Sequence, residues 1–86
     1  MENIVLPYWY DDLYAFECEA KGCAFNFETI INGEKRAFNF YDAVRFSQDA
    51  EMEIQQNGYF QDENAVILQK VDRQNIMNYL RTVAIR

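Results

Sequence analysis

Two adjacent carboxylates, Asp11 and Asp12, are the residues of this sequence whose types and spacing could most directly support chemistry. They lie in the segment PYWYDDLYAF (residues 7–16), among aromatic side chains. Paired carboxylates can transfer protons or bind a metal ion when a pocket encloses them. In an extended segment, however, consecutive side chains point to opposite sides. We therefore expect Asp11 and Asp12 to form a polar turn before the first strand rather than a catalytic or metal site.

The two cysteines, Cys18 and Cys23, could in principle act as a nucleophile, as metal ligands or as a disulfide. A catalytic thiolate needs a neighbouring base or a positive field, and the sequence contains no histidine. Their spacing matches no metal motif, and the strand register derived below places them diagonally rather than opposite each other. The sequence also contains no glycine-rich phosphate loop and no nucleophile elbow. These features predict a protein that is not an enzyme and that carries no cofactor and no metal.

The charge of the 86-residue chain is −6, and it is unevenly distributed. Residues 1–20 carry five acids and no base, and residues 42–64 carry six acids and one arginine, whereas residues 65–86 carry four bases and one acid. Nucleic-acid binding is not expected, because phosphate contacts need clustered lysine and arginine. The asymmetry instead favours a face that steers a basic protein partner.

The N-terminal residues MENIVLPYWYDD lack the basic region and the apolar run of a signal peptide. No stretch approaches the roughly 20 apolar residues of a membrane span. We therefore expect a cytoplasmic protein with reduced thiols and no membrane partner.

The clearest structural signal is Asn32-Gly33, which lies between two runs rich in strand-forming residues. This dipeptide is favoured in two-residue type I′ hairpin turns, because both positions need a positive φ. The turn predicts that Phe25 faces Phe40 and that Phe27 faces Phe38. All four phenylalanines then share one face of the sheet.

A second turn is predicted at Lys21-Gly22, between LYAFECEA and CAFNFETI. It adds Tyr14, Phe16 and Cys18 to the phenylalanine face. Because both turns agree on which side is the core, we predict an antiparallel meander of three strands over residues 13–20, 23–31 and 34–41.

The remaining segments read as two amphipathic helices and a strand. DAVRFSQDAEMEIQQNG is predicted to be a helix with Asp42 as its N-cap, Gly58 as its C-cap and a stripe at Ala43, Phe46, Ala50 and Ile54. A strand follows at residues 65–71 and is expected to be buried on both faces at its centre. Asp72 then begins a last helix whose buried side chains are Ile76, Leu80 and Val83.

The predicted fold is an α+β two-layer sandwich of order β-β-β-α-β-α, with both helices packed on the phenylalanine face. We expect a single domain over residues 1–86, in which residues 1–12 form an aromatic and acidic N-terminal arm. Residues 1–6 could add a further edge strand.

Aromatic rings combined with acids are typical of protein interfaces, where rings anchor the contact and charges steer the partner. We therefore predict a small acidic protein-binding module that neutralises or escorts a basic partner. In composition alone, without a shared motif, the chain is similar to immunity and antitoxin-type proteins. The predicted partner-binding residues are Tyr8, Trp9, Tyr10, Asp11, Asp12, Asp49, Glu53, Tyr59, Phe60, Asp62 and Glu63.

Two other functions remain open at this point. One is a homodimeric structural or chaperone-like protein that pairs through an exposed sheet edge or through residues 65–71. The other is a small ligand-binding protein with a pocket beneath the N-terminal aromatic arm.

Overall fold

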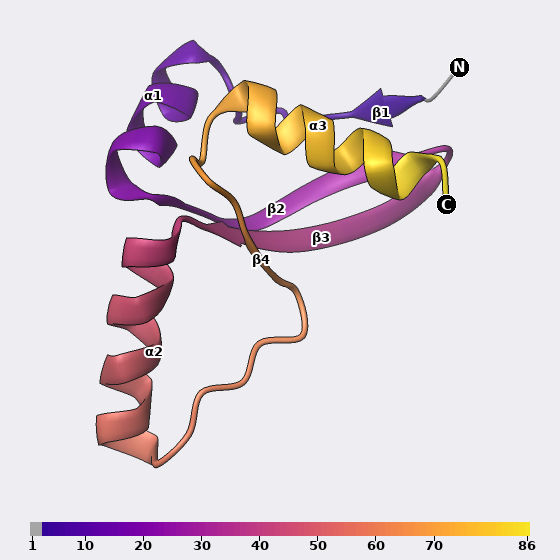
Figure 1. The fold of residues 1–86 in the computed structure, drawn as a ribbon. Helices are drawn as coiled ribbons and strands as arrows, with labels where there is room; N and C mark the ends of the chain where they lie inside the picture. Colours follow the sequence, from indigo (N-terminus) through magenta and orange to yellow (C-terminus); the bar gives the residue numbers. More distant parts are fainter. Residues whose placement is uncertain (1–2) are drawn as a thin grey trace.

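The sheet that organises this chain has four strands in the order β1-β2-β3-β4. The computed structural model describes residues 3–86. Its elements, in chain order, are β1 (Ile4–Val5), α1 (Asp12–Lys21), β2 (Cys23–Ile31), β3 (Glu34–Tyr41), α2 (Ala43–Asn57), β4 (Ala65–Ile67) and α3 (Arg73–Ala84). The first three strands pair antiparallel, and β4 pairs parallel to β3. Helix α3 lies across one face of the sheet, whereas α2 extends away from it (Figure 1).

The α+β class is confirmed, but the element order is β-α-β-β-α-β-α and the sheet is mixed. The predicted pure meander is therefore wrong. The N-terminal edge strand is confirmed at Ile4–Val5, and residues 1–2 of that prediction lie outside the described part of the chain.

The hairpin of β2 and β3 forms in the predicted register at its turn. Phe27 pairs with Phe38, and Ile31 pairs with Glu34 on either side of the turn. Asn32 and Gly33 have φ values of 51° and 84°. These positive values are those that the type I′ turn requires, which explains why Asn-Gly is found here.

A bulge shifts the register at the other end of this hairpin. Ala24 pairs with Phe40, so the predicted pairing of Phe25 with Phe40 is wrong. The irregularity lies between Ala24 and Phe27, where Asn26 has a φ of 50° and its amide N–H donates to the Oδ1 of Asn39 at 2.7 Å. The extra residue in β2 moves Phe25 off the core face, and its side chain is 42% exposed.

The predicted first strand, residues 13–20, is instead the helix α1. Asp11 is its N-cap, and the carboxylate accepts a hydrogen bond from the N–H of Tyr14 at 2.9 Å. Gly22 is its C-cap in the left-handed conformation rather than part of a hairpin turn. The cap and the good helix formers of this segment outweigh its apparent alternation. Tyr14 and Phe16 consequently lie outside the core, with exposures of 47% and 71%.

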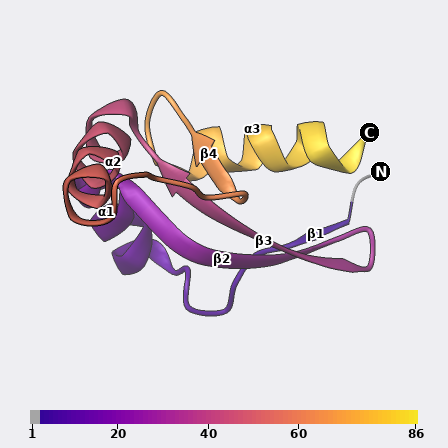
Figure 2. The same cartoon turned by 90° about the horizontal axis from the view of Figure 1, so that it is seen from below.

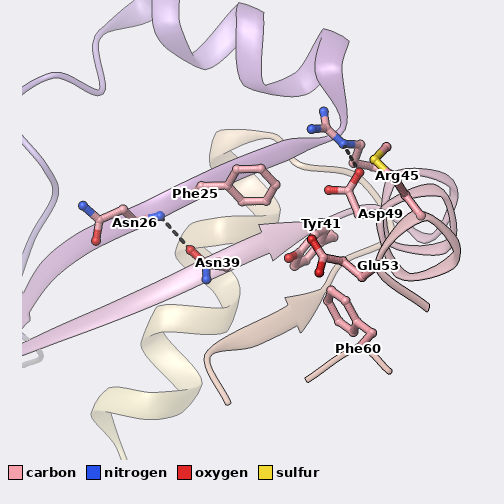
Figure 3. Close-up of a pocket in the computed structure, with 9 residues that line it drawn as sticks. Phe25, Asn26, Asn39, Tyr41, Arg45, Asp49, Glu53 and Phe60 are labelled. Atoms are coloured by element: carbon pink, nitrogen blue, oxygen red, sulfur yellow. Dashed lines mark hydrogen bonds and ion pairs between the residues drawn. The ribbon is translucent and has the colours of Figure 1, made fainter. Parts of the chain in front are cut away.

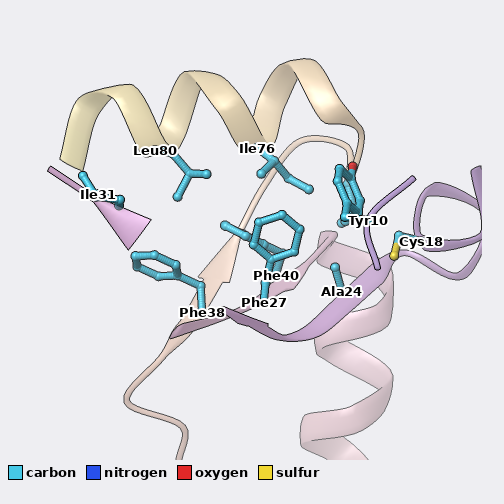
Figure 4. Packing of buried hydrophobic residues seen from close by; sticks show 10 residues of the cluster. Tyr10, Cys18, Ala24, Phe27, Ile31, Phe38, Phe40, Ile76 and Leu80 are labelled. Atoms are coloured by element: carbon cyan, nitrogen blue, oxygen red, sulfur yellow. The ribbon is translucent and has the colours of Figure 1, made fainter. Parts of the chain in front are cut away.

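The core lies between the sheet and α3. Ile76 and Leu80 of α3 are completely buried, and they point toward Phe27, Phe38 and Phe40 of the sheet (Figure 4). The predicted helix and its N-cap Asp72 are therefore confirmed, whereas Val83, which was expected to be buried, is only partly buried. Tyr10 and Cys18 close the core at the side of α1.

Helix α2 forms with the predicted caps, but it does not pack on the predicted face of the sheet. Asp42 accepts from the N–H of Arg45 at 2.8 Å, and Gly58 ends the helix. Phe46 of α2 packs edge-on against Tyr41, with ring centroids 5.3 Å apart. Because Tyr41 follows the core residue Phe40 in β3, its side chain lies on the opposite face of the sheet. Helix α2 therefore does not pack on the phenylalanine face, and no residue of it is fully buried.

The fourth strand is shorter than predicted and lies at an edge. It spans only Ala65–Ile67, and Ile67 is 51% exposed. The β-branched run at residues 65–71 was the basis for predicting a central strand. Beyond the end of β4, this run enters the core at Val71, which is fully buried. Within residues 3–86, no helix combines the length and the apolar composition needed to cross a bilayer.

Candidate partner-binding site

A groove lies on the face of the sheet opposite α3, between the ends of β2 and β3, helix α2 and the segment after it. Its volume is about 600 Å³. Figure 3 shows side chains from these elements turned toward it. The lining residues are Phe25, Asn26, Asn39, Tyr41, Arg45, Asp49, Met52, Glu53 and Phe60.

Aromatic rings form the floor and one wall of the groove. Phe25 packs against Tyr41 with ring centroids 5.2 Å apart, and Phe46 packs against Phe60 at 5.3 Å. Together with the contact between Tyr41 and Phe46, these pairs form one continuous cluster. The bulge in β2 is what delivers Phe25 to this cluster instead of to the core.

Asp62 fixes the polar end of the groove. Its Oδ2 accepts hydrogen bonds from the hydroxyl of Tyr41 and from the Nδ2 of Asn39, both at 3.1 Å. Its Oδ1 accepts from the N–H of Asn64 at 2.9 Å. Burial, together with the hydrogen bond and negative charge of Asp62, raises the pKa of Tyr41 to about 12. Tyr41 is therefore a neutral hydrogen-bond donor, and Asp62 holds a carboxylate beside the rings.

Arg45 and Asp49 form an ion pair along α2, with the Nε and Oδ1 atoms 3.0 Å apart. The guanidinium lies 5.4 Å from the ring centroid of Phe25, and its Nη1 donates to the Sγ of Cys23 at 3.1 Å. The hydrogen bond to Asp49 raises the pKa of Arg45. Burial raises the pKa of Cys23, although the charge of Arg45 opposes this shift. Burial thus favours the protonated thiol of Cys23 over the thiolate.

Glu53 and Met52 form the outer rim of the groove. Both side chains are exposed, and one carboxylate oxygen of Glu53 accepts from the Nδ2 of Asn57 at 2.7 Å. Three carboxylates thus border the groove, at Asp49, Glu53 and Asp62, and Arg45 neutralises only one. Aromatic faces beside uncompensated carboxylates are suited to a cationic side chain, which the rings attract through cation–π interactions and the acids through charge.

Four of the predicted partner-binding residues meet at this groove. Asp49, Glu53 and Phe60 line it, and Asp62 hydrogen-bonds to its wall. Tyr59 is 65% exposed on the neighbouring segment. Glu63 points elsewhere, because it lines a different hollow beside β4.

The other predicted residues form a separate group at the start of α1. Tyr8 is 99% exposed, whereas Trp9 is half-buried and Tyr10 is buried in the core. The rings of Trp9 and Tyr10 pack against Phe27 with centroid distances of 5.8 and 5.0 Å. Trp9 and Tyr10 are therefore part of the packing around the core.

Asp11 and Asp12 both make contacts within the fold. Asp11 caps α1, and Asp12 pairs with Arg73 at 3.0 Å in an exposed position. Within residues 3–86, no group of three or more histidine, cysteine, aspartate or glutamate side chains could hold a metal ion.

The sequence predicted some of the residues that line this groove but not the others. Arg45, Asp49 and Glu53 follow one another at intervals of four residues, which places them in one row along a helix. Phe25 was not recognised, because its position depends on the bulge, and Tyr41 was not recognised as its partner in the groove. Asn26 is the only local signal for the bulge, since asparagine tolerates a positive φ.

Comparison of the chain with protein-family models, with curated proteins and with solved structures finds no match.

Proposed function

We propose that the chain is a non-catalytic protein-binding module whose partner is a basic protein. The surface that makes the contact is formed by α2 and residues 58–64. A lysine or arginine side chain of the partner enters the groove described above. The observation that carries this proposal is the combination of the rings of Phe25 and Phe60 with the carboxylates of Asp49, Glu53 and Asp62 around one hollow.

The charge of the surrounding surface supports the same partner. Residues 42–64 carry a net charge of −5, and most of them are exposed. Such a field accelerates encounters with a basic protein and disfavours acidic ones. The groove itself would provide the specific contact, because exposed charge alone contributes little affinity.

The two cysteine thiols and the helix-capping aspartates are in states that favour a binding role over a catalytic role. Burial raises the pKa of both Cys18 and Cys23. Asp11, Asp42 and Asp72 are each occupied by capping a helix.

Affinity capture from the native host with matched baits tests the proposal. The baits are the unaltered chain, Glu53→Lys at the rim of the groove and Glu34→Lys at the hairpin turn of β2 and β3. The two substitutions change the net charge equally, but only the first alters the groove. We expect basic proteins to be retained by the unaltered chain and by Glu34→Lys and to be lost with Glu53→Lys. Equal retention by all three baits, or loss of acidic proteins only, would contradict the proposal.

A homodimer is the second candidate, and exposed apolar side chains favour it. Leu13 and Phe16 of α1 are 63% and 71% exposed, and they lie one turn apart on the same side of the helix. Ala50 and Ile54 of α2 line a second, shallower hollow of about 570 Å³. Light scattering over a range of concentrations distinguishes the two functions, because a constant monomer mass excludes the dimer.

A further inference from the structure

The groove between α2 and the sheet already holds one cation, the guanidinium of Arg45. Its central carbon lies 5.4 Å from the ring centroid of Phe25, and its Nε donates to the Oδ1 of Asp49 at 3.0 Å. One guanidinium thus contacts an aromatic face and a carboxylate at the same time. Arginine is suited to this arrangement, because its charge is planar and delocalised and its N–H groups form a fork.

The aromatic rings of the groove form a stepped surface rather than a cage. Phe25 contacts Tyr41 edge-on, with ring centroids 5.2 Å apart. Tyr41 also contacts Phe46, and Phe46 contacts Phe60, both at 5.3 Å. Rings at these distances touch each other, so no rounded ammonium or trimethylammonium group fits between neighbours. A planar guanidinium needs only one exposed ring face, as Arg45 finds on Phe25.

The carboxylates of Asp49 and Glu53 supply hydrogen-bond acceptors beside these rings. Within residues 3–86, Asp49 uses one oxygen for Arg45, and Glu53 uses one for the Nδ2 of Asn57. The other oxygen of each can still accept. Side chains four residues apart on a helix have Cβ atoms about 5–6 Å apart, so one forked donor can contact both carboxylates. Asp62 is less suited, because it already accepts three hydrogen bonds.

The mouth of the groove is open to solvent. Figures 1 and 2 together show that α2 stands at one end of the sheet and projects from it. Phe25, Met52 and Glu53, which line the groove, are all exposed. An ammonium group in an open site keeps most of its strongly bound water, whereas a guanidinium is weakly hydrated and can lie on a ring. An open groove with rings therefore favours arginine over lysine.

We propose that the groove selects an arginine side chain of the partner over lysine and over methylated lysine. The inference rests on the proposed function, because it specifies the cation that enters the same site. The partner's guanidinium stacks on the ring of Phe60 and donates to the carboxylates of Glu53 and Asp49. Glu53 and Phe60 determine the specificity, because Arg45 already occupies Phe25 and one oxygen of Asp49.

An NMR titration with four small probes tests this inference on the unaltered chain. The probes are the N-acetyl methylamides of arginine, lysine, trimethyl-lysine and norleucine, which share one backbone and differ only in the side chain. A cation–π contact at an exposed site corresponds to a factor of about two to five in affinity. We therefore expect the arginine probe to bind about threefold or more tightly than the lysine and trimethyl-lysine probes, and the norleucine probe not to bind.

The outcomes separate this inference from the proposed function. If the lysine or trimethyl-lysine probe binds as tightly as the arginine probe and norleucine does not bind, the selection of arginine is overturned and the proposed function stands. If none of the three cationic probes binds, the proposed function fails, and the inference fails with it.

Two variants of adjacent residues test the ring contact. Phe60→Leu keeps an apolar side chain but removes the ring face, so it should weaken binding of the arginine probe about threefold or more. Tyr59→Leu is the matched control, because Tyr59 is exposed and lies outside the lining of the groove, and it should leave the affinity unchanged. Equal arginine affinities in Phe60→Leu and the unaltered chain would contradict the proposal. If Phe60→Leu does not fold, the comparison of the four probes on the unaltered chain still decides it.

Discussion

At the scale of single residues, Gly22 is the C-cap of α1 and also contacts Asp42, the N-cap of α2. It has a φ of +74°, and its carbonyl accepts from the N–H of Asp42 at 2.8 Å. A Cβ at this position would collide with the carboxylate of Asp42, whereas a Cβ at Gly58 would meet nothing within 4 Å. The two helix-capping glycines are therefore matched in backbone conformation but not in surroundings.

We predict that Gly22→Ala lowers the free energy of unfolding by about 2–5 kcal/mol, through the left-handed backbone and the steric overlap together. Gly58→Ala should cost only about 1–2 kcal/mol, because it has the backbone term alone. Urea denaturation of both variants measures the difference. Equal losses would show that the contact with Asp42 relaxes without cost.

The hydroxyls of Tyr10 and Tyr41 make a second comparison. The hydroxyl of Tyr41 donates to Asp62, whereas the buried hydroxyl of Tyr10 has no hydrogen-bond partner within residues 3–86. We predict that Tyr41→Phe lowers the free energy of unfolding by about 1–3 kcal/mol, and that Tyr10→Phe leaves it unchanged or raises it. Chemical denaturation measures both. A larger loss for Tyr10→Phe would mean that its hydroxyl makes a contact that the structure lacks.

The same two residues predict the behaviour of the protein at alkaline pH. Burial is the main cause that raises the pKa of Tyr10 and of Tyr41 from 10 to about 12. The folded protein therefore favours the neutral phenols. Their contribution to stability is fully present below pH 10 and is lost as the pH rises through 12. The free energy of unfolding should fall over this range, and the fall should be smaller in the double variant Tyr10→Phe/Tyr41→Phe. An equal fall in both proteins would contradict the assignment.

At the scale of elements, the sequence predicted best where local chemistry decides the structure. The Asn32-Gly33 turn and the caps Asp42, Gly58 and Asp72 were all correct, because each depends on a few adjacent residues. Residues 13–20 were mistaken for a strand, since an alternating pattern of Tyr14, Phe16 and Cys18 fits a strand as readily as a short helix. The N-cap at Asp11 was the overlooked signal.

Long-range packing explains the remaining differences. The bulge near Asn26 changes the face on which Phe25 lies, and with it the composition of the groove. Of the predicted stripe of α2, Phe46 and Ala50 are partly buried, whereas Ala43 and Ile54 are exposed. The spacing of a stripe also does not reveal which face of the sheet the helix covers. Asp49, Glu53 and Phe60 could therefore be identified as candidates, while their meeting with Phe25 and Tyr41 could not.

The two longest helices should differ in their contribution to stability. Ile54 of α2 is 52% exposed, whereas Leu80 of α3 is completely buried. We predict that Leu80→Ala costs about 2–5 kcal/mol of unfolding free energy and that Ile54→Ala costs less than about 1 kcal/mol. Thermal or urea denaturation measures this. A cost for Ile54→Ala close to that for Leu80→Ala would mean that another surface covers α2 in solution, as the homodimer requires.

At the scale of the whole molecule, the two faces of the sheet differ in what covers them. One face, covered by α3, forms the core and carries most of the stability. The opposite face, with α2 and residues 58–64, carries the acidic groove, and its lining residues lie outside the core between the sheet and α3.

The central claim is that the groove binds a cationic side chain, and an NMR titration with a lysine analogue tests it most directly. N-acetyl-lysine methylamide and its uncharged counterpart, N-acetyl-norleucine methylamide, are added separately to the protein. The variants Glu53→Gln, at the groove, and Glu51→Gln, on the same helix but outside the lining, are measured in parallel. We predict that the lysine analogue alone shifts the ring resonances of Phe25, Tyr41 and Phe60, and that Glu53→Gln weakens this binding several-fold while Glu51→Gln does not. Equal shifts from both analogues, or lysine shifts that avoid these rings, would contradict the account.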